Sequence, residues 1–318
     1  MTDLTRDIIR GKTRAIARGI SLVENNTAGR EELIDALFPH TGRARIWGIT
    51  GPPGAGKSTL ADLLISSERK KGHRVAVVAV DPSSPFTGGA LLGDRLRMQS
   101  HAEDDGVFIR SMASRGHLGG VSGATLDAIK VLDAAGFDTI IVETIGVGQT
   151  EVDIIELTDI VLLVLVPGMG DEIQAMKAGV MEIGDIFVIN KSDKEGAEKL
   201  RTEVEYVLGF KYTGEKEKMN PVCMVSAKMN KGIEHLTGEM DERFRQLEEA
   251  GELRQKRKER IRKELLRIFS LKIHELLDKK MDFYNNVGEW AEMIYNKDVK
   301  PYHFINERLR FFLKKESE

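Results

Sequence analysis

The chain has 318 residues, of which 41% are hydrophobic and 31% charged, so it can form one large α/β domain with helical additions. Its net charge of −3 argues against a surface built for nucleic acid or anionic membrane, and no apolar run approaches the ~18 residues of a spanning helix. The single cysteine, Cys223, cannot form an internal disulfide, and the N-terminus lacks the apolar core of a secretory signal. We therefore expect a cytoplasmic protein.

The apolar spacing changes along the chain. Residues 4–40 carry apolar side chains at helical spacing, which predicts two helices ahead of the main domain. From residue 45 onward, short apolar runs alternate with segments long enough for helices, and this alternation predicts a doubly wound, mainly parallel sheet with ligands at the carboxyl ends of its strands. The runs are Ile46–Ile49, Val75–Val80, Val107–Ile109, Thr139–Val142, Ile160–Val166, Ile186–Ile189 and Val222–Val225.

Beyond about residue 240 the helical spacing returns, so we predict an N-terminal helical extension over 1–43, a central α/β domain over 44–240 and a C-terminal helical extension over 241–318. The segment LRQKRKERIRK at 253–263 is strongly basic. We interpret it as the solvated face of an amphipathic helix; the alternative, a nucleic-acid-binding arm, would need an aromatic platform that is missing. The aromatic C-terminal stretch is expected to pack on the body or on a second copy, which makes it a candidate dimerisation region.

The strongest chemical motif is GITGPPGAGKSTL at 48–60, in which Gly51–Ser58 fits the phosphate-loop pattern G-x-x-x-x-G-K-[ST] between a predicted strand and helix. Lys57 would reach the β- and γ-phosphates and Ser58 would bind Mg²⁺. The alternative is a glycine-rich turn without a ligand. The candidate phosphate-binding residues are Gly51, Pro52, Pro53, Gly54, Ala55, Gly56, Lys57, Ser58 and Thr59.

Two further strands end in carboxylates. Asp81 ends one strand, and Asp94 follows in the segment 80–98, which is rich in Pro and Gly. Both are candidate residues of the metal surroundings. The neighbouring Arg95 and Arg97 are either surface ion-pair partners or phosphate ligands.

The second of these strands leads into ETIGVGQT at 143–150. Glu143 lies where a nucleotide hydrolase needs a carboxylate near Mg²⁺, and Gly146 would offer an N–H to the γ-phosphate. Gly148 would let the segment move when that phosphate leaves. Gln149 is a candidate for orienting the attacking water. The alternative is a capped strand end followed by a flexible loop.

Two other loops contain charged residues that do not by themselves indicate a catalytic mechanism. Arg115 and His117 lie in FIRSMASRGHLGG at 108–120, where His117 is better explained as a loop histidine than as an acid or base. Asp171 and Lys177 lie in PGMGDEIQAMKAG at 167–179.

Two motifs late in the domain indicate the base. In NKSD, Asp193 can accept hydrogen bonds from guanine N1–H and N2–H₂, which adenine lacks, while Asn190 and Lys191 complete the motif. Sites built on such bonds reject the lacking analogue by roughly 10⁴–10⁵. A backbone N–H in the following SAK motif could meet guanine O6. The SAK residues are Ser226, Ala227 and Lys228. Together with the phosphate loop, these motifs predict GTP and GDP as ligands.

With these motifs, the chain resembles the methylmalonyl-CoA mutase-associated GTPases (the MeaB/ArgK/MMAA group) from about residue 10 to about 300. The block DPSSPFTGGALLGDRLRM is its most specific part. The resemblance implies a P-loop fold and a homodimer held partly by the terminal helices. It also implies a chaperone that gates cofactor loading of an adenosylcobalamin-dependent acyl-CoA mutase and protects that enzyme. The sequence shows no sign that this chain binds cobalamin directly.

Carried over by position, the resemblance places Ser58, Asp81, Asp94 and Glu143 around Mg²⁺ and makes Asp171 and Lys177 part of a switch that responds to the partner. Two alternatives stay open. A GTPase that loads a metal centre would want a His-rich tract or a Cys pair, and neither is present. A kinase linked to amino-acid transport is disfavoured by NKSD, which selects guanine.

Overall fold

The computed structural model describes residues 2–82, 101, 103–114, 120–144, 150–168, 183–211 and 220–314. The chain forms two compact units, Met1–Arg260 and Ile261–Glu318.

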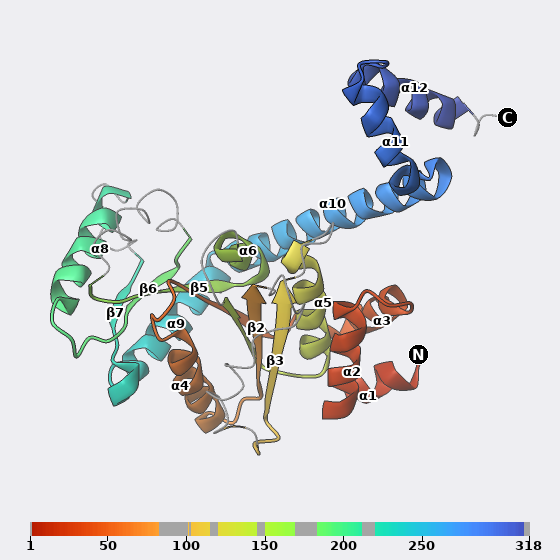
Figure 1. Cartoon of the computed structure of the whole chain (residues 1–318). Coiled ribbons are helices and arrows are strands. Elements are labelled where there is room, and N and C mark those ends of the chain that lie inside the picture. Colours follow the sequence, from red (N-terminus) through yellow and green to blue (C-terminus); the bar gives the residue numbers. More distant parts are fainter. Residues whose placement is uncertain are drawn as a thin grey trace. The chain divides into compact units, whose positions relative to one another are not determined.

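A seven-stranded parallel sheet forms the centre of the first unit (Figure 1). Its strand order is β3-β2-β4-β1-β5-β6-β7, and every registered pair is parallel. Each of the seven apolar runs predicted from the sequence forms one of these strands, with only Val166 and Val225 lying one residue past a strand end, and this confirms the α/β class. The strands are β1 (Arg45–Thr50), β2 (Val75–Pro82), β3 (Val107–Ser114), β4 (Thr139–Thr144), β5 (Ile160–Leu165), β6 (Ile186–Ile189) and β7 (Val222–Met224).

The register brings the ends of distant strands together. β1 lies between β4 and β5, with Ile49 paired to Glu143 and Thr50 paired to Leu163. Because all these strands run the same way, their carboxyl ends meet at one edge of the sheet, which is where ligands bind in open α/β folds.

Helices cover both faces of the sheet. One apolar core joins the sheet to α5 (Gly120–Ala134), α6 (Thr150–Leu157) and the N-terminal helices. The opposite core packs the sheet against α4 (Lys57–Lys70) and α9 (Ile233–Glu249), and α8 (Ala197–Lys211) packs over β5 and β6. Neighbouring residues of β1 divide between the faces, as the side-chain period of two requires: Ile46 joins the first core and Trp47 the second.

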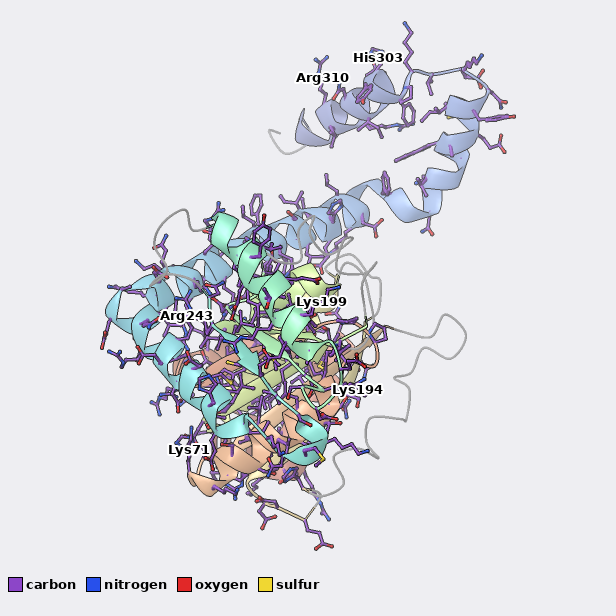
Figure 2. All side chains as sticks on the ribbon, turned by 90° about the vertical axis from the view of Figure 1, so that its left-hand side faces the viewer. Lys71, Lys194, Lys199, Arg243, His303 and Arg310 are labelled. Carbon is purple, nitrogen blue, oxygen red and sulfur yellow. The ribbon has the colours of Figure 1, made fainter. Side chains whose placement is uncertain are left out.

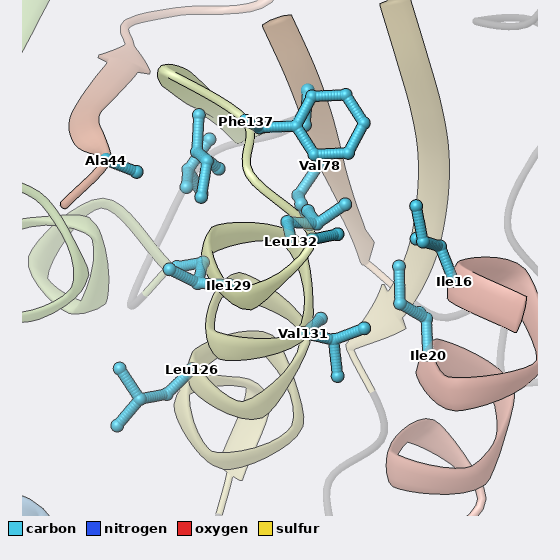
Figure 3. Packing of buried hydrophobic residues seen from close by; sticks show 14 of the residues in the cluster. Ile16, Ile20, Ala44, Val78, Leu126, Ile129, Val131, Leu132 and Phe137 are labelled. Atoms are coloured by element: carbon cyan, nitrogen blue, oxygen red, sulfur yellow. The ribbon is translucent and has the colours of Figure 1, made fainter. Parts of the chain in front are cut away.

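The N-terminal helices belong to the main core. Figure 3 shows Ile16 and Ile20 of α2 beside Val131 of α5, and all three side chains are buried. The prediction of two helices is wrong, because the structure has three: α1 (Asp3–Ile9), α2 (Thr13–Glu24) and α3 (Arg30–Leu37). The additional break comes at Gly11, whose φ of 73° is left-handed and ends the first helix.

The basic segment at 253–263 lies in α10 (Glu252–Met281), and two of its arginines bind a buried carboxylate. Asp159, which has no exposed surface, accepts from Arg257 (Nη2 to Oδ2, 2.7 Å) and from Arg260 (Nη2 to Oδ1, 3.1 Å). Arg257 also donates to the carbonyl oxygens of Gly42 and Ala44 at 2.7 and 2.9 Å. The prediction of a solvated charged face is therefore wrong for Arg257 and Arg260.

A second carboxylate beside the sheet is held in the same way. Asp185, just before β6, accepts from the Val161 amide at 3.0 Å and from Lys256 Nζ at 3.1 and 3.2 Å. Arg243 of α9, labelled in Figure 2, adds a bond of 3.4 Å. Asp159 directly precedes β5 and Asp185 directly precedes β6. The start of α10 therefore lies against the edge of the sheet that is opposite the phosphate loop.

The second unit holds the rest of α10, α11 (Phe283–Tyr295) and α12 (Pro301–Lys314). Its small core contains Trp290, packed edge-on against Phe283 and Phe304 with ring centroids 5.5 Å apart in both pairs. In contrast, Leu265 and Phe269 of α10 are 62% and 66% exposed. In the part of the chain described, no helix is long and apolar enough to cross a membrane.

Candidate functional site

The phosphate-loop motif connects β1 to α4 at the centre of the sheet. Gly51 has a φ of 139°, and a Cβ there would lie 2.2 Å from the carbonyl oxygen of Val164 in β5. Gly56 has a φ of 86°, and a Cβ there would lie 2.5 Å from Nδ2 of Asn190. Both positions therefore require glycine, so that the loop can curl in front of the first turn of α4. A loop of this shape at a helix N-terminus is an anion-binding site.

Lys57 begins α4 and is folded over the loop. Its ammonium group donates to the carbonyl oxygens of Gly51 and Pro52 at 2.6 and 3.0 Å, and the residue is buried. These bonds hold a positive charge inside the curve of the loop, close to the amide groups of the helix N-terminus. The arrangement suits a phosphate chain.

Ser58 and Glu143 meet at the edge of the sheet. The Ser58 hydroxyl donates to Oε1 of Glu143 at 2.7 Å, and Glu143 is only 1% exposed. Both contribute hard oxygen atoms, the ligands that Mg²⁺ prefers, and Mg²⁺ takes only one or two protein ligands alongside water and phosphate. The pair therefore fits Mg²⁺. Among the described residues, no group of three or more His, Cys, Asp or Glu side chains could hold a metal ion.

A second pair of hydroxyls lies beside this one and was not singled out from the sequence. Thr144 Oγ1 donates to Thr50 Oγ1 at 3.0 Å, and both residues are buried. Thr50 precedes the phosphate loop and Thr144 follows Glu143. The bond therefore ties the ends of β1 and β4 together. In the sequence, each of these threonines is a polar residue at the end of an otherwise apolar run, and this pattern could have identified the pair.

Asn190 joins the phosphate loop to the SAK segment. The residue is 2% exposed; its Nδ2 donates to the Ala55 carbonyl at 2.7 Å, and its Oδ1 accepts from the Ala227 amide at 3.1 Å. Lys191 adopts a left-handed φ of 58° and its Nζ donates to the Gly54 carbonyl at 2.7 Å. The NKSD motif is thus bonded directly to the loop that would hold the phosphates.

Asp193 lies against the same segment. Its Oδ1 accepts from the hydroxyl of Ser226, and this bond lowers the pKa of Asp193 below its usual value. A lowered pKa keeps the carboxylate ionised at neutral pH, and the charge is lost only as the pH falls through that lowered value. Ala227 and Lys228 lie in a short 3-10 helix, Ala227–Met229. The amide of Ala227 points at Asn190, and the predicted contact between this segment and guanine O6 stays a prediction.

The remaining predicted site residues are only partly placed. The backbone of Asp81 lies in β2 opposite Ala113 of β3, but its side chain is outside the described part of the chain. The other residues fall outside the described residues altogether: Asp94, Arg95, Arg97, Arg115, His117, Gly146, Gly148, Gln149, Asp171 and Lys177.

The chain is similar to several known proteins. The family model described as "Methylmalonyl Co-A mutase-associated GTPase MeaB" matches residues 16–282. A Pyrococcus abyssi protein named "Putative GTPase" is 52% identical over 305 residues, which cover 94% of this chain and 93% of that protein. The mouse protein named "Methylmalonic aciduria type A homolog, mitochondrial" is 36% identical over 270 residues, covering 79% of this chain and 64% of that protein.

Among solved structures, the crystal structure of an LAO/AO transport system kinase superposes with a TM-score of 0.71 at 26% identity. The superposition covers 98% of this chain and 97% of the other. The fold found here, with its helices before and after the sheet, is therefore shared along almost the whole length of both chains.

The bridging role of Asn190 predicts a loss of stability when its side chain is shortened. Asn190→Ala removes the partner of two buried backbone groups, the Ala55 carbonyl and the Ala227 amide. Each unsatisfied group costs about 1–3 kcal/mol. We expect the free energy of unfolding, measured by urea titration without nucleotide, to fall by at least about 2 kcal/mol.

The matched control is Asn25→Ala, which removes an exposed side-chain bond to Ser21 and should change stability by less than about 0.5 kcal/mol. Equal urea midpoints for the two variants would show that Asn190 does not join the two segments.

Proposed function

The chain belongs to the MeaB family of methylmalonyl-CoA mutase-associated GTPases, and we propose that it uses Mg²⁺-dependent GTP hydrolysis to gate an adenosylcobalamin-dependent acyl-CoA mutase. The chain is a P-loop GTPase by this membership. The observation that carries the proposal is the buried contact of Ser58 with Glu143 beside the phosphate loop, because GTP hydrolysis needs a metal-binding pair next to the phosphates.

The described residues support specific roles in hydrolysis. Lys57 would leave the carbonyl oxygens of Gly51 and Pro52 and bind the β- and γ-phosphate oxygens. The Ser58 hydroxyl and Glu143 would hold the metal ion, Glu143 directly or through water. When bound, Mg²⁺ neutralises charge that develops on the phosphate oxygens. The chain supplies position and charge, and the attacking group is water rather than a side chain.

Base selection is proposed for the segment that Asn190 connects to the phosphate loop. Asp193 is ionised and would accept from guanine N1–H and N2–H₂, and the Lys191 side chain would lie over the base. Because Asn190 and Lys191 are bonded to the loop at Ala55 and Gly54, the proposed base site is tied directly to the phosphate site.

Residues outside the described part of the chain complete the proposal. Asp81 and Asp94 would add to the metal surroundings, the amide of Gly146 would bind the γ-phosphate, and Gln149 would orient the water. Asp171 and Lys177 would belong to a segment that responds to the mutase. The resemblance to the family implies these roles for the residues at these positions.

We also propose that two copies of the chain associate through α10. Leu265, Leu266 and Phe269 are each more than half exposed along this helix. Exposed apolar side chains that gather on one face often mark an interaction surface. A second copy is the proposed occupant, as the resemblance to homodimeric relatives implies.

The proposed role of Asp193 predicts a change of base preference. Asp193→Asn replaces two acceptor oxygens by one acceptor and one donor, which clashes with guanine N–H groups and suits the oxygen of xanthine. We expect GTP affinity to fall by at least ten-fold and affinity for xanthosine triphosphate to rise, both measured by competition against a fluorescent nucleotide. Unchanged GTP preference would show that another residue selects the base.

Coupling to the mutase predicts that hydrolysis depends on metal and partner. Multiple-turnover GTP hydrolysis should be slow with Mg²⁺ alone, lost on adding EDTA, and raised severalfold or more by a saturating adenosylcobalamin-dependent acyl-CoA mutase. Groups supplied in trans are worth ~10³–10⁵ in other GTPases, so a severalfold rise is a conservative expectation. If saturating mutase left the rate of GTP hydrolysis unchanged, the gating proposal would be wrong, although the chain would still be a GTPase. The control is bovine serum albumin at the same concentration.

The dimer proposal predicts that charge on the apolar face of α10 separates the copies. We expect the wild-type protein to sediment as twice the chain mass of 35.5 kDa, and Leu265→Glu combined with Phe269→Glu to sediment as one chain. The control, His274→Glu, changes a residue nine positions beyond Leu265 and thus on the opposite side of a helix with 3.6 residues per turn. A wild-type protein that sediments as a monomer would contradict the proposal.

A further inference from the structure

Two buried threonines join β1 to β4 at the edge of the sheet that carries the phosphate loop. Thr50 is the last residue of β1 and Thr144 the last residue of β4, and the two are 0% and 3% exposed. The hydroxyl of Thr144 donates to Oγ1 of Thr50 at 3.0 Å. Because both groups are shielded from water, the bond has no competition from solvent.

The strand register shows why this side-chain bond matters. The registered pairs between β1 and β4 end with Ile49 and Glu143. One residue further on, Thr50 and Thr144 are each paired with the strand on their other side, which is β5 for Thr50 and β2 for Thr144. In the described part of the chain, the bond between the two hydroxyls is therefore what joins β1 to β4 at this level.

The threonine bond and Glu143 lie on opposite faces of the sheet. Side chains alternate between the two faces along a strand. Ile141 of β4 packs in the same core as α4, and Val142 packs in the opposite core. Glu143 therefore points toward α4, where it accepts from the Ser58 hydroxyl at 2.7 Å, and Thr144 points to the other face. The threonines thus lie behind the pair of oxygen donors and do not face a metal ion held by it.

We propose that the bond between Thr50 and Thr144 positions Glu143 against Ser58, so that both threonines are positioning residues of the Mg²⁺ site. The proposal rests on the role given above to Ser58 and Glu143 in holding the metal ion. Ser58 follows β1 through the phosphate loop and Glu143 belongs to β4, so the separation of these two side chains depends on how closely the ends of the two strands are held. Mg²⁺ demands near-ideal octahedral geometry at about 2.0–2.1 Å, so a small widening lowers its affinity.

The test measures how strongly Mg²⁺ promotes nucleotide binding and hydrolysis by the full chain. The affinity of a fluorescent, non-hydrolysable GTP analogue is measured with Mg²⁺ and with EDTA, and the Mg²⁺ concentration for half-maximal GTP hydrolysis is measured in parallel. Thr50→Val and Thr144→Val each remove the bond and keep the shape of the side chain. We expect each variant to need about ten-fold more Mg²⁺, the lower end of what loss of a group behind a metal ligand costs. The affinity in EDTA should equal that of wild type, because the phosphate loop is unchanged.

The double variant, Thr50→Val with Thr144→Val, separates positioning from stability. A single valine leaves the other buried hydroxyl without this bond, whereas replacing both partners by apolar groups of the same shape can be nearly neutral. We therefore expect the double variant to melt at a higher temperature than either single variant and still to need as much Mg²⁺ as they do. A double variant with the Mg²⁺ requirement of wild type would overturn the proposal.

The matched control is Thr139→Val, at the first residue of β4. Thr139 is fully buried, and its hydroxyl donates to Oε2 of Glu68 at 3.1 Å, at the opposite edge of the sheet. This variant should lose thermal stability and keep the Mg²⁺ requirement of wild type, and so should Thr144→Ser, which retains the hydroxyl, keep that requirement. An equal rise for Thr139→Val and Thr144→Val would show that lost stability is the cause. If a single valine variant fails to fold, the double variant and Thr144→Ser provide the comparison.

Ser58→Ala distinguishes a failure of this proposal from a failure of the metal site itself. If Ser58→Ala leaves the Mg²⁺ requirement unchanged, the role proposed for Ser58 and Glu143 is wrong. If Ser58→Ala raises the requirement and Thr144→Val does not, only the positioning role of the threonines is wrong.

Discussion

The parallel pairing of β1 with β4 and β5 is the constraint on which the rest of this structure depends. It brings the end of β1, with the phosphate loop behind it, against the end of β4. As a result the hydroxyl of Ser58 meets a carboxylate 85 residues away in the sequence. The pairing of β5 with β6 then brings Asn190 to the back of the loop, 135 residues from Ala55. The side chains of such a site have little freedom to move relative to one another, because each lies at or near the end of a strand whose register is set by its neighbours.

At the opposite edge of the sheet, two buried carboxylates are paired with cations. Asp159 and Asp185 lie there with backbone amides and the cations of α9 and α10 around them. Burying a carboxylate is costly unless it is paired and fully hydrogen-bonded. Asp159 and Asp185 are both paired and hydrogen-bonded, and they attach the start of α10 to the sheet. The sheet thus has the candidate site at one edge and the attachment of the start of α10 at the other.

The two edges are connected by α6, which runs from the segment after Glu143 to the arginines of α10. This attachment fixes the start of α10 to the sheet through Arg260. It also gives a reason for the basic residues of α10: two of them bind at the sheet, and the apolar side chains further along the same helix stay exposed.

The amino-acid sequence by itself determined the strands, the phosphate-loop motif and the motifs that are predicted to select the base. Each is local: apolar runs of three to seven residues predict buried parallel strands, and the glycines of the loop carry their backbone requirement wherever they are. The number of N-terminal helices was missed because Gly11 lies within a continuous helical spacing, and only its left-handed backbone shows the break.

Only the tertiary structure decided which residues act together. Asn190 was predicted as part of a base-binding motif, but its bonds to Ala55 and Ala227 depend on the strand order. The Thr50–Thr144 pair depends in the same way on β1 lying beside β4. Arg257 and Arg260 belong to a basic run whose composition is that of a solvated helix face. Whether a cation in such a run meets water or a buried carboxylate is set by what packs against the helix, and spacing along the chain does not contain that information.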